Sequence, residues 1–234
     1  MKKWLIVLFS VALVSCGNDK TGEKEKTATA IDNLTAPVLS GTIIYKNTCV
    51  GDEEGVNAFK SFAPTEYAVS VNNNRVRFKE IGGIVGTNLL LNFNDSIYYQ
   101  LDDAEGTYKQ VFRKDYSHQF KEIELEKTTE SEVILGHSCT KYVVKSSPFV
   151  GENTKQSLWI TRDFNYPYDQ GKYVGSGNYA GILPLMVISD VGFGTILKAE
   201  SIDEHTTVTM EAVLLETETL EENFEIPDNY KIVE

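Results

Sequence analysis

The sequence lacks the residue patterns of the common metal, nucleotide and hydrolase sites. Only three of its 234 residues are histidines, and none has the H-x-x-x-H spacing or the neighbouring cysteine pair of a zinc site. The sequence also contains no G-x-S-x-G motif, no glycine-rich phosphate loop followed by lysine and no aspartate-rich calcium loop. It therefore predicts no catalytic residue, no metal and no cofactor, and we expect a non-enzymatic protein.

Basic residues are scarce as well. Lysine and arginine total 22 against 34 aspartates and glutamates, so the formal net charge is −12. An acidic chain has no electrostatic surface for nucleic acid, and charge does not hold it on an anionic lipid surface. Hydrophobic residues at 41% and charged residues at 24% are typical of a globular protein. We therefore expect a folded domain without a nucleic-acid partner.

No apolar run near the N-terminus is long enough to span a membrane. Residues 4–14 are almost wholly apolar, but at about 1.5 Å per residue they extend roughly 16 Å, against about 30 Å of hydrocarbon. Lys2 and Lys3 precede this run and small residues follow it, which is the pattern of a secretory signal peptide over residues 1–15.

The end of this segment, Leu13-Val14-Ser15-Cys16, resembles the lipobox of bacterial lipoproteins. The resemblance implies that the Cys16 thiol carries a diacylglyceryl group with palmitate-like chains and becomes the first residue of the mature chain. It also implies a lipid-anchored protein of the cell envelope, at the outer membrane and facing the periplasm. The alternative is an ordinary signal peptide in which Cys16 is incidental.

Residues 16–40 contain few apolar residues and no clear period, so we interpret them as a lipidated flexible tether. From Gly41 to the end of the chain the dominant period is two, which predicts β-strands. Asn72, Asn73 and Asn74 tolerate left-handed turn geometry and predict a hairpin between their flanking strands. In all we expect about eleven strands in an antiparallel sandwich or barrel-like sheet. The clearest runs are TIIYK, EYAVSV, RVRFK, SIYYQL, TYKQVFR, FKEIELE, CTKYVVK, SLWIT, TILKAE and TTVTMEAVLL.

Two segments depart from this period. In residues 53–64, Val56, Phe59 and Phe62 recur every three residues and Pro64 follows, which predicts a short helix. Residues 175–189 contain an apolar block interrupted by proline, which is a helix beginning near the proline, a loop across the open face of the sheet, or simply buried core. As a cover over a ligand cavity, this block would contribute Ile182, Leu183, Pro184, Leu185, Met186 and Ile188.

Two cysteines remain once Cys16 is assigned to the anchor. Cys49 and Cys139 would share an exported compartment in which disulfides persist. A bond between them would close a loop of about 90 residues and stabilise the fold by roughly 4–5 kcal/mol in the chain-entropy model. The alternative is two separate buried thiols, and the spacing along the sequence does not decide between the two.

Three motifs in this order resemble a family of uncharacterised bacterial lipoproteins that contain a domain of unknown function, similar to the LolA/LolB lipoprotein carriers and to the GLPGLI family. They are VILGHSCTKYVVKS followed by LWITRDFN, then AGILPLMV, and finally FEIPDNYKIV. The resemblance implies a mainly β protein with a single antiparallel sheet, curved into an unclosed half-barrel over residues 41–234. One or two short helices or a lid segment would lie on its concave face, and in the carriers that cavity accepts acyl chains.

Three functions compete on this basis. The first is a membrane-anchored, non-enzymatic lipoprotein that binds an apolar ligand, either a lipid or an acyl chain, in the half-barrel. The second is an envelope protein-interaction or stress-sensor module whose barrel is filled by its own side chains. The third is an enzyme, which would need convergent polar groups in a cleft.

Overall fold

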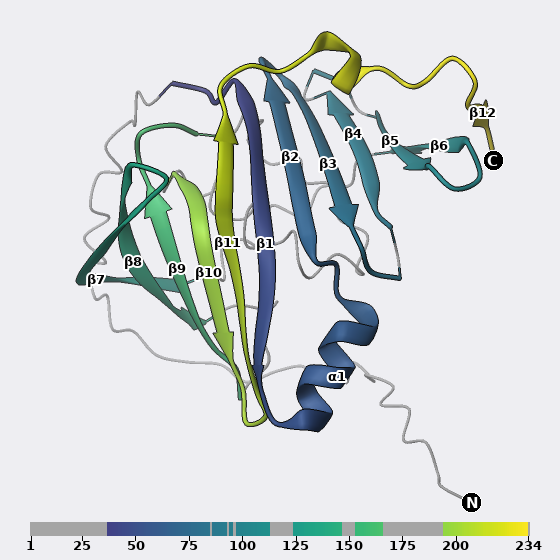
Figure 1. Ribbon diagram of the computed structural model, residues 1–234. Helices are drawn as coiled ribbons and strands as arrows, with labels where there is room; N and C mark the ends of the chain where they lie inside the picture. Colours follow the sequence, from purple (N-terminus) through teal and green to yellow (C-terminus); the bar gives the residue numbers. More distant parts are fainter. Residues whose placement is uncertain are drawn as a thin grey trace, which may run out of the picture. The chain divides into compact units, whose positions relative to one another are not determined.

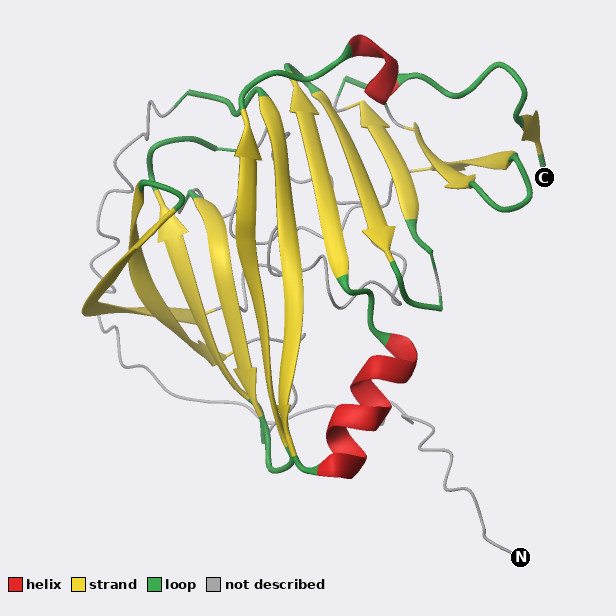
Figure 2. Ribbon diagram, in the orientation of Figure 1, coloured by secondary structure: helices red, strands yellow, loops and turns green. Residues whose placement is uncertain are grey.

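One sheet accounts for most of the described residues (Figures 1 and 2). The computed structural model describes residues 37–84, 86–92, 94–95, 97–112, 124–146, 153–165 and 194–233. Within these ranges the sheet has twelve strands. They are β1 (Gly41–Gly51), β2 (Glu66–Asn72), β3 (Arg75–Ile81), β4 (Asn88–Asn92), β5 (Ile97–Asp102), β6 (Thr107–Phe112), β7 (Glu124–Ile134), β8 (His137–Ser146), β9 (Lys155–Thr161), β10 (Thr195–Ile202), β11 (Thr206–Glu216) and β12 (Lys231–Ile232).

The strand order is β12-β6-β5-β4-β3-β2-β1-β11-β10-β9-β8-β7. Every pair is antiparallel except the short β12, which pairs in parallel with β6. The sheet is curved and its two edges, β12 and β7, do not meet (Figure 1). The predicted fold, a mainly β protein with a single open antiparallel sheet, is therefore confirmed.

The register aligns the apolar side chains of successive strands on one side of the sheet. Tyr45 pairs with Tyr67 on one side and with Ala212 on the other, and this alignment continues outward in both directions. Because side chains alternate between the faces, paired residues share a face. We call this side the apolar face; its buried members are Ile43, Tyr45, Tyr67, Val69, Val71, Val76, Phe78, Leu89, Leu91, Tyr98, Tyr142, Leu158, Ile160, Ala199, Met210 and Ala212.

The opposite face of β3–β6 is covered by the C-terminal segment. Phe224, in the 3-10 helix η1 (Glu221–Phe224), packs with Leu90 and Leu101, and the ring of Tyr230 joins the same cluster. Arg75 lies over the Phe224 ring at 5.0 Å from its centroid and pairs with Glu221 at 2.5 Å. The C-terminal segment therefore buries a second, smaller hydrophobic cluster on the side away from the apolar face.

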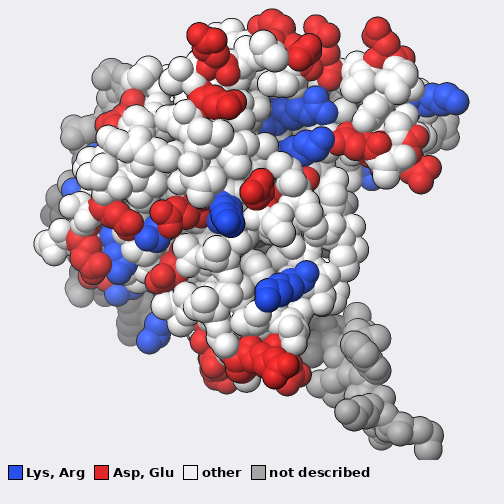
Figure 3. Space-filling model, viewed as in Figure 1, with Lys and Arg blue, Asp and Glu red and all other residues white. Residues whose placement is uncertain are grey.

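The opposite face of β8–β11 carries charged pairs around a single buried tryptophan. The ammonium groups of Lys141 and Lys198 lie 5.2 and 4.8 Å from the centre of the Trp159 ring. Lys198 also pairs with Glu132 at 3.0 Å, and Lys141 with Glu130 at 2.9 Å. In Figure 3, positive and negative side chains are mixed across this side of the molecule. The two ammonium groups thus cover the Trp159 ring and are paired with glutamates on the same face.

Turn residues match their backbone conformations at two hairpins. Asn73 has φ of 52° in the β2–β3 turn, so the predicted asparagine hairpin is confirmed. In the β7–β8 turn both Leu135 and Gly136 have positive φ, 53° and 85°. A two-residue turn of this kind requires positive φ at both positions, which glycine adopts at little cost.

The predicted short helix is confirmed as α1 (Glu53–Phe62). The side chain of Asp52 caps it by accepting the Gly55 N–H at 2.7 Å, and the helix ends just before Ala63 and Pro64. It contains no buried residue and lies at the ends of β1 and β2 rather than across the apolar face (Figure 1). Among the described residues, no helix has the length and apolar character needed to cross a lipid bilayer.

The same carboxylate ties α1 to the β10–β11 turn. Asp52 Oδ2 lies 2.8 Å from Nδ1 of His205, and both groups are exposed. The hydrogen bond and the negative charge of Asp52 raise the pKa of His205 above its ordinary value of 6.5. The Gly55 N–H, and after it His205, lower the pKa of Asp52 below 3.8.

We expect this pair to stabilise the fold most between the two ordinary pKa values. A raised histidine pKa stabilises the folded chain below the ordinary value, and this contribution is lost as pH rises through the folded pKa; a lowered carboxylate pKa stabilises above its ordinary value and is lost as pH falls through the folded one. An NMR titration of Asp52→Asn should show the His205 pKa falling toward its ordinary value. Asp163→Asn, which removes the carboxylate beside His137, should leave the His205 titration unchanged. An unaltered His205 pKa in Asp52→Asn would contradict the assignment.

Candidate functional site

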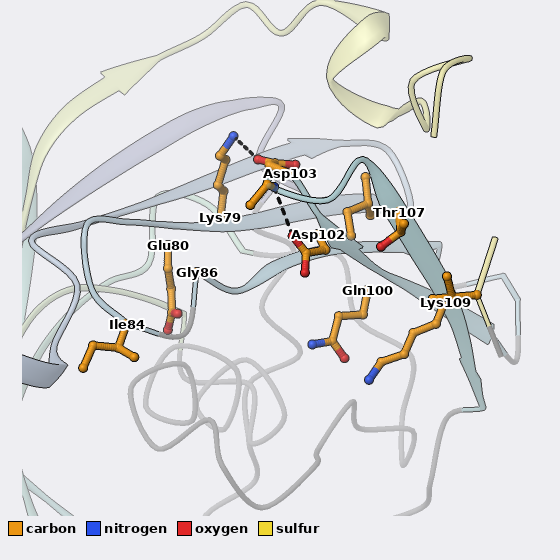
Figure 4. A pocket seen from close by; sticks show the side chains of 12 residues that line it. Lys79, Glu80, Ile84, Gly86, Gln100, Asp102, Asp103, Thr107 and Lys109 are labelled. Carbon is orange, nitrogen blue, oxygen red and sulfur yellow. Dashed lines mark hydrogen bonds and ion pairs between the residues drawn. The ribbon is translucent and has the colours of Figure 1, made fainter. Parts of the chain in front are cut away.

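A cleft of about 520 Å³ opens where the β3–β4 loop meets the β5–β6 turn. Figure 4 shows Glu80, Gln100, Asp102 and Lys109 directed to one side of the sheet, while Lys79 and Asp103 lie on the other. The volume of the cleft falls within the range of small-molecule sites, roughly 300–1,000 Å³. The lining residues are Lys79, Glu80, Ile84, Gly86, Gln100, Leu101, Asp102, Asp103, Ala104, Thr107, Lys109 and Val233.

The cleft continues the apolar face. One row of paired residues crosses the sheet from β1 to β6, and its first four members are apolar and buried whereas its last two are polar. The row consists of Ile43, Val69, Phe78, Leu89, Gln100 and Lys109. A ligand in the cleft would therefore meet charged and amide groups at one end and a hydrophobic surface at the other.

The neighbouring row becomes polar in the same way. Tyr45 and Tyr67 are buried, and Tyr67 pairs with Glu80 on β3. Burial raises the pKa of Tyr67, and the negative charge of Glu80 raises it further. The carboxylate of Glu80 accepts the backbone N–H of Thr87 through Oε2 at 3.0 Å. This backbone contact holds Glu80 in place at the border between the apolar face and the cleft.

A hydrogen-bond network fixes the outer wall of the cleft. Asp103 accepts hydrogen bonds from Asn88 at 2.7 Å and from the Tyr230 hydroxyl at 2.9 Å, and it pairs with Lys79 at 2.6 Å. Burial alone would raise the pKa of Asp103, but these three partners together lower it below its ordinary value. Asn88 in turn accepts from the Arg77 guanidinium at 3.0 Å. The Lys79 and Asp103 charges are thus already paired with each other.

The inner side of the cleft has groups left for a ligand. Within the described ranges, neither the Lys109 ammonium nor the Gln100 amide has a hydrogen-bond or ion-pair partner. Asp102 uses Oδ1 to accept the backbone N–H groups of Ala104 and Glu105, each at 3.0 Å, so its Oδ2 is open. The cleft thus combines one free cation, one free amide and two carboxylates.

The sequence did not single out these residues. Lys79 and Glu80 fall at the end of a strand pattern, and Asp102-Asp103 is a solvated turn signal. The alternation does carry a signal. Residues two apart on a strand share a face, and on β3 and β5 the apolar residues Phe78 and Tyr98 are followed two positions later by the polar residues Glu80 and Gln100. Recognising that the two polar positions meet requires the register between strands, which the sequence alone does not contain.

Most residues that the sequence did single out lie outside the described ranges. These are the anchor Cys16 and the whole predicted cover, Ile182, Leu183, Pro184, Leu185, Met186 and Ile188; His118, one of the three histidines, also lies outside them. At the other end of the predicted tether, Leu39 is buried in the main core cluster and its N–H donates to the carbonyl of Asn165 at 2.7 Å. The packed part of the chain therefore begins slightly before Gly41.

Cys49 and Cys139 are free thiols, so the disulfide alternative is not realised. Cys49 lies on β1 and Cys139 on β8, four positions apart in the strand order. Strands lie about 4.8 Å apart, so four strand spacings amount to roughly 19 Å, and the register also offsets the two residues along the strands; a disulfide reaches only about 7 Å between Cα atoms. Burial raises the pKa of the Cys139 thiol to about 11, which makes it a poor nucleophile.

No group of three or more metal-ligating side chains occurs in the part of the chain that the structure describes. The imidazole rings of His137 and His205 each contact one carboxylate, Asp163 and Asp52 respectively, and the two pairs lie on different strands and turns. The described residues therefore contain no built metal centre, and the cleft is the candidate site.

The chain is similar in fold to several solved structures, all at low sequence identity. PNGF-II matches with a TM-score of 0.46 and 13% identity over 84% of this chain, which spans 31% of that protein. The Mycobacterium tuberculosis lipoprotein LppX matches with 0.31 and 11%, covering 80% of this chain and 89% of that one. A LolA superfamily protein from Nitrosomonas europaea matches with 0.33 and 10%, covering 85% and 94%.

No curated protein matches this sequence. One family model does match, over residues 75–230, which is about two thirds of the chain. The match begins at β3 and ends just before β12, so it includes both strands of the β7–β8 hairpin, most of the cleft and the C-terminal cover. The chain belongs to the DUF4412 family, a domain of unknown function.

Proposed function

We propose that the domain is a non-enzymatic lipoprotein of the cell envelope that binds an apolar ligand, a lipid or an acyl chain, on the apolar face. The observation that carries this proposal is the extent of that face, which runs across strands β1–β5 and β8–β11 with buried members on each. At its β5–β6 end the same face becomes polar and opens into the cleft. The apolar tail of an amphipathic ligand would contact the apolar face, and its polar headgroup would lie in the cleft.

The described secondary structure supplies no second layer for this face. Helix α1 has no buried residue, and η1 packs on the opposite side of the sheet. We keep as part of the proposal the sequence-based prediction that residues 182–188 cover this face. Because the apolar-face side chains are buried, an acyl chain can reach them only if other groups move aside, and we propose the cleft as its entrance.

We also propose that Cys16 carries the lipid anchor, with the domain held at the outer membrane and facing the periplasm. The acidic charge of −12 supports a covalent attachment, since charge alone would not hold this chain on an anionic surface.

The proposal predicts that the purified protein retains lipid. Native mass spectrometry should show an additional mass of one acyl-chain ligand, and protein stripped of lipid in organic solvent and refolded should take up 13C-labelled palmitate, with new cross-peaks to apolar-face residues in NMR spectra. A protein that carries no added mass and takes up no palmitate would contradict the proposal.

A second candidate is a protein-interaction module. The observation that favours it is that the buried members of the apolar face are no more than 6% exposed, as expected for a face filled by the protein itself. In that case the protein would take up no palmitate, and cross-linking in intact cells would yield one specific envelope partner.

A further inference from the structure

We infer that the cleft recognises a zwitterionic phosphoethanolamine group, with the phosphate beside Lys109 and Gln100 and the ammonium beside Glu80 and Asp102. This inference rests on the proposed function, because it names the polar end of the amphipathic ligand. It depends on which groups in the cleft are already paired, which are free and how they are distributed.

The donors for a phosphate come from two adjacent strands. Gln100 on β5 and Lys109 on β6 are direct cross-strand partners, so their side chains project from the same face next to each other. Figure 4 shows both directed to the same side of the sheet. A lysine ammonium beside an amide N–H₂ provides charge-assisted and neutral hydrogen bonds to phosphate oxygens.

The acceptors for an ammonium group come from β3, which carries Glu80, and from the end of β5, which carries Asp102. Glu80 keeps Oε1 open after its Oε2 accepts the Thr87 N–H, and Asp102 keeps Oδ2 open after Oδ1 accepts two turn N–H groups. Two carboxylates and one lysine leave a net charge of −1 on this side, because the Lys79 and Asp103 charges are paired with each other. A purely anionic ligand would meet repulsion from both carboxylates, whereas a zwitterion complements both signs.

A further feature of the site is an unsatisfied buried hydroxyl. Thr87 is 1% exposed, and its Oγ1 has no hydrogen-bond partner in the described structure. Its neighbours Gly86 and Glu80 both line the cleft. Buried hydroxyl groups are almost always hydrogen-bonded, so an unpaired one beside a cleft marks a position where a bound polar group would complete the network.

The test compares three single-chain ligands with the same acyl chain, each below its critical micelle concentration: lysophosphatidylethanolamine, lysophosphatidylglycerol and monoacylglycerol. We expect the full chain to bind lysophosphatidylethanolamine most tightly in titration calorimetry. Lys109→Gln should weaken both phosphate-containing ligands by roughly three- to ten-fold and leave monoacylglycerol unchanged, because each charge-assisted hydrogen bond to an exposed group contributes modestly. Glu80→Gln, which keeps an acceptor for the Thr87 N–H, should weaken lysophosphatidylethanolamine alone.

Lys155→Gln is the matched control, since Lys155 is an exposed lysine on β9, far from the cleft. Equal affinity for all three ligands, or an affinity order that neither cleft variant alters, would overturn the headgroup inference while leaving acyl-chain binding intact. If no ligand binds, the proposed function fails, and soluble O-phosphoethanolamine decides the inference separately: chemical-shift changes at Gln100 and Lys109 would support it, and none would overturn it.

Discussion

Cys16→Ser is expected to abolish acyl labelling and to release the protein from the membrane fraction. The reason is that nothing else proposed for this chain holds it there. Removal of Lys2 and Lys3 with the signal peptide would take the formal charge from −12 to −14, which favours repulsion from anionic lipids. Each buried methylene of an anchor contributes about 0.8 kcal/mol, so two or three acyl chains bind far more strongly than any weak residual contact.

The measurement is incorporation of an alkyne-labelled palmitate, followed by cell fractionation. Cys49→Ser serves as the control, because Cys49 is a partly buried residue of β1 and should leave both labelling and fractionation unchanged. Acyl label on Cys16→Ser, or its full retention in the membrane fraction, would show that the lipobox interpretation is wrong.

Gly194→Ala should destabilise the domain by roughly 3–5 kcal/mol, since it combines backbone strain with a collision in a packed region. Gly194 precedes β10 and has φ of 108°, a conformation that residues with a side chain rarely adopt. A Cβ at this position would lie 2.1 Å from the carbonyl oxygen of Thr161 on β9. That oxygen belongs to backbone, so relief requires the start of β10 to move away from β9. Urea unfolding followed by Trp159 fluorescence measures the change.

Gly136→Ala separates the two contributions. Gly136 also has positive φ, 85°, but a Cβ there would meet nothing within 4 Å. Gly136→Ala should therefore lower the free energy of unfolding by only about 1–2 kcal/mol, which is the strain of a left-handed residue. Equal destabilisation by the two substitutions would show that the contact with Thr161 contributes nothing, which would contradict the described packing.

Strands with one polar face were predictable because their alternation is visible. In β3, Val76 and Phe78 alternate with Arg75, Arg77 and Lys79, and this pattern predicted both the strand and its buried side. β4 was not among the quoted runs, because its Leu89, Leu90 and Leu91 show no alternation. The structure explains why: Leu89 and Leu91 belong to the apolar face, while Leu90 packs under Phe224 of the C-terminal segment. A strand covered on both sides loses the period of two.

The sequence alone could not predict which residues distant along the chain lie close together in the fold. The question of whether Cys49 and Cys139 bond depended on the number of strands between them, and that number follows from β11 joining β1. The cleft likewise depends on the register of β3–β6, which brings Glu80 on β3 to the same face as the cross-strand pair Gln100 and Lys109. Each of these residues is unremarkable in its local sequence, and only their juxtaposition suggests a ligand.

The strand order also has a kinetic consequence. Strands β1–β6 and β7–β11 form two meanders in which each strand pairs with its neighbour along the chain, apart from the β1–β11 ladder that joins them. Most pairs within the meanders close short loops, although the β9–β10 pair closes the connection of residues 162–194, whereas the ladder between the first and eleventh strands must close a far longer loop. We therefore expect the two meanders to form independently, and the pairing of β1 with β11 to be the slower step that joins them into one sheet.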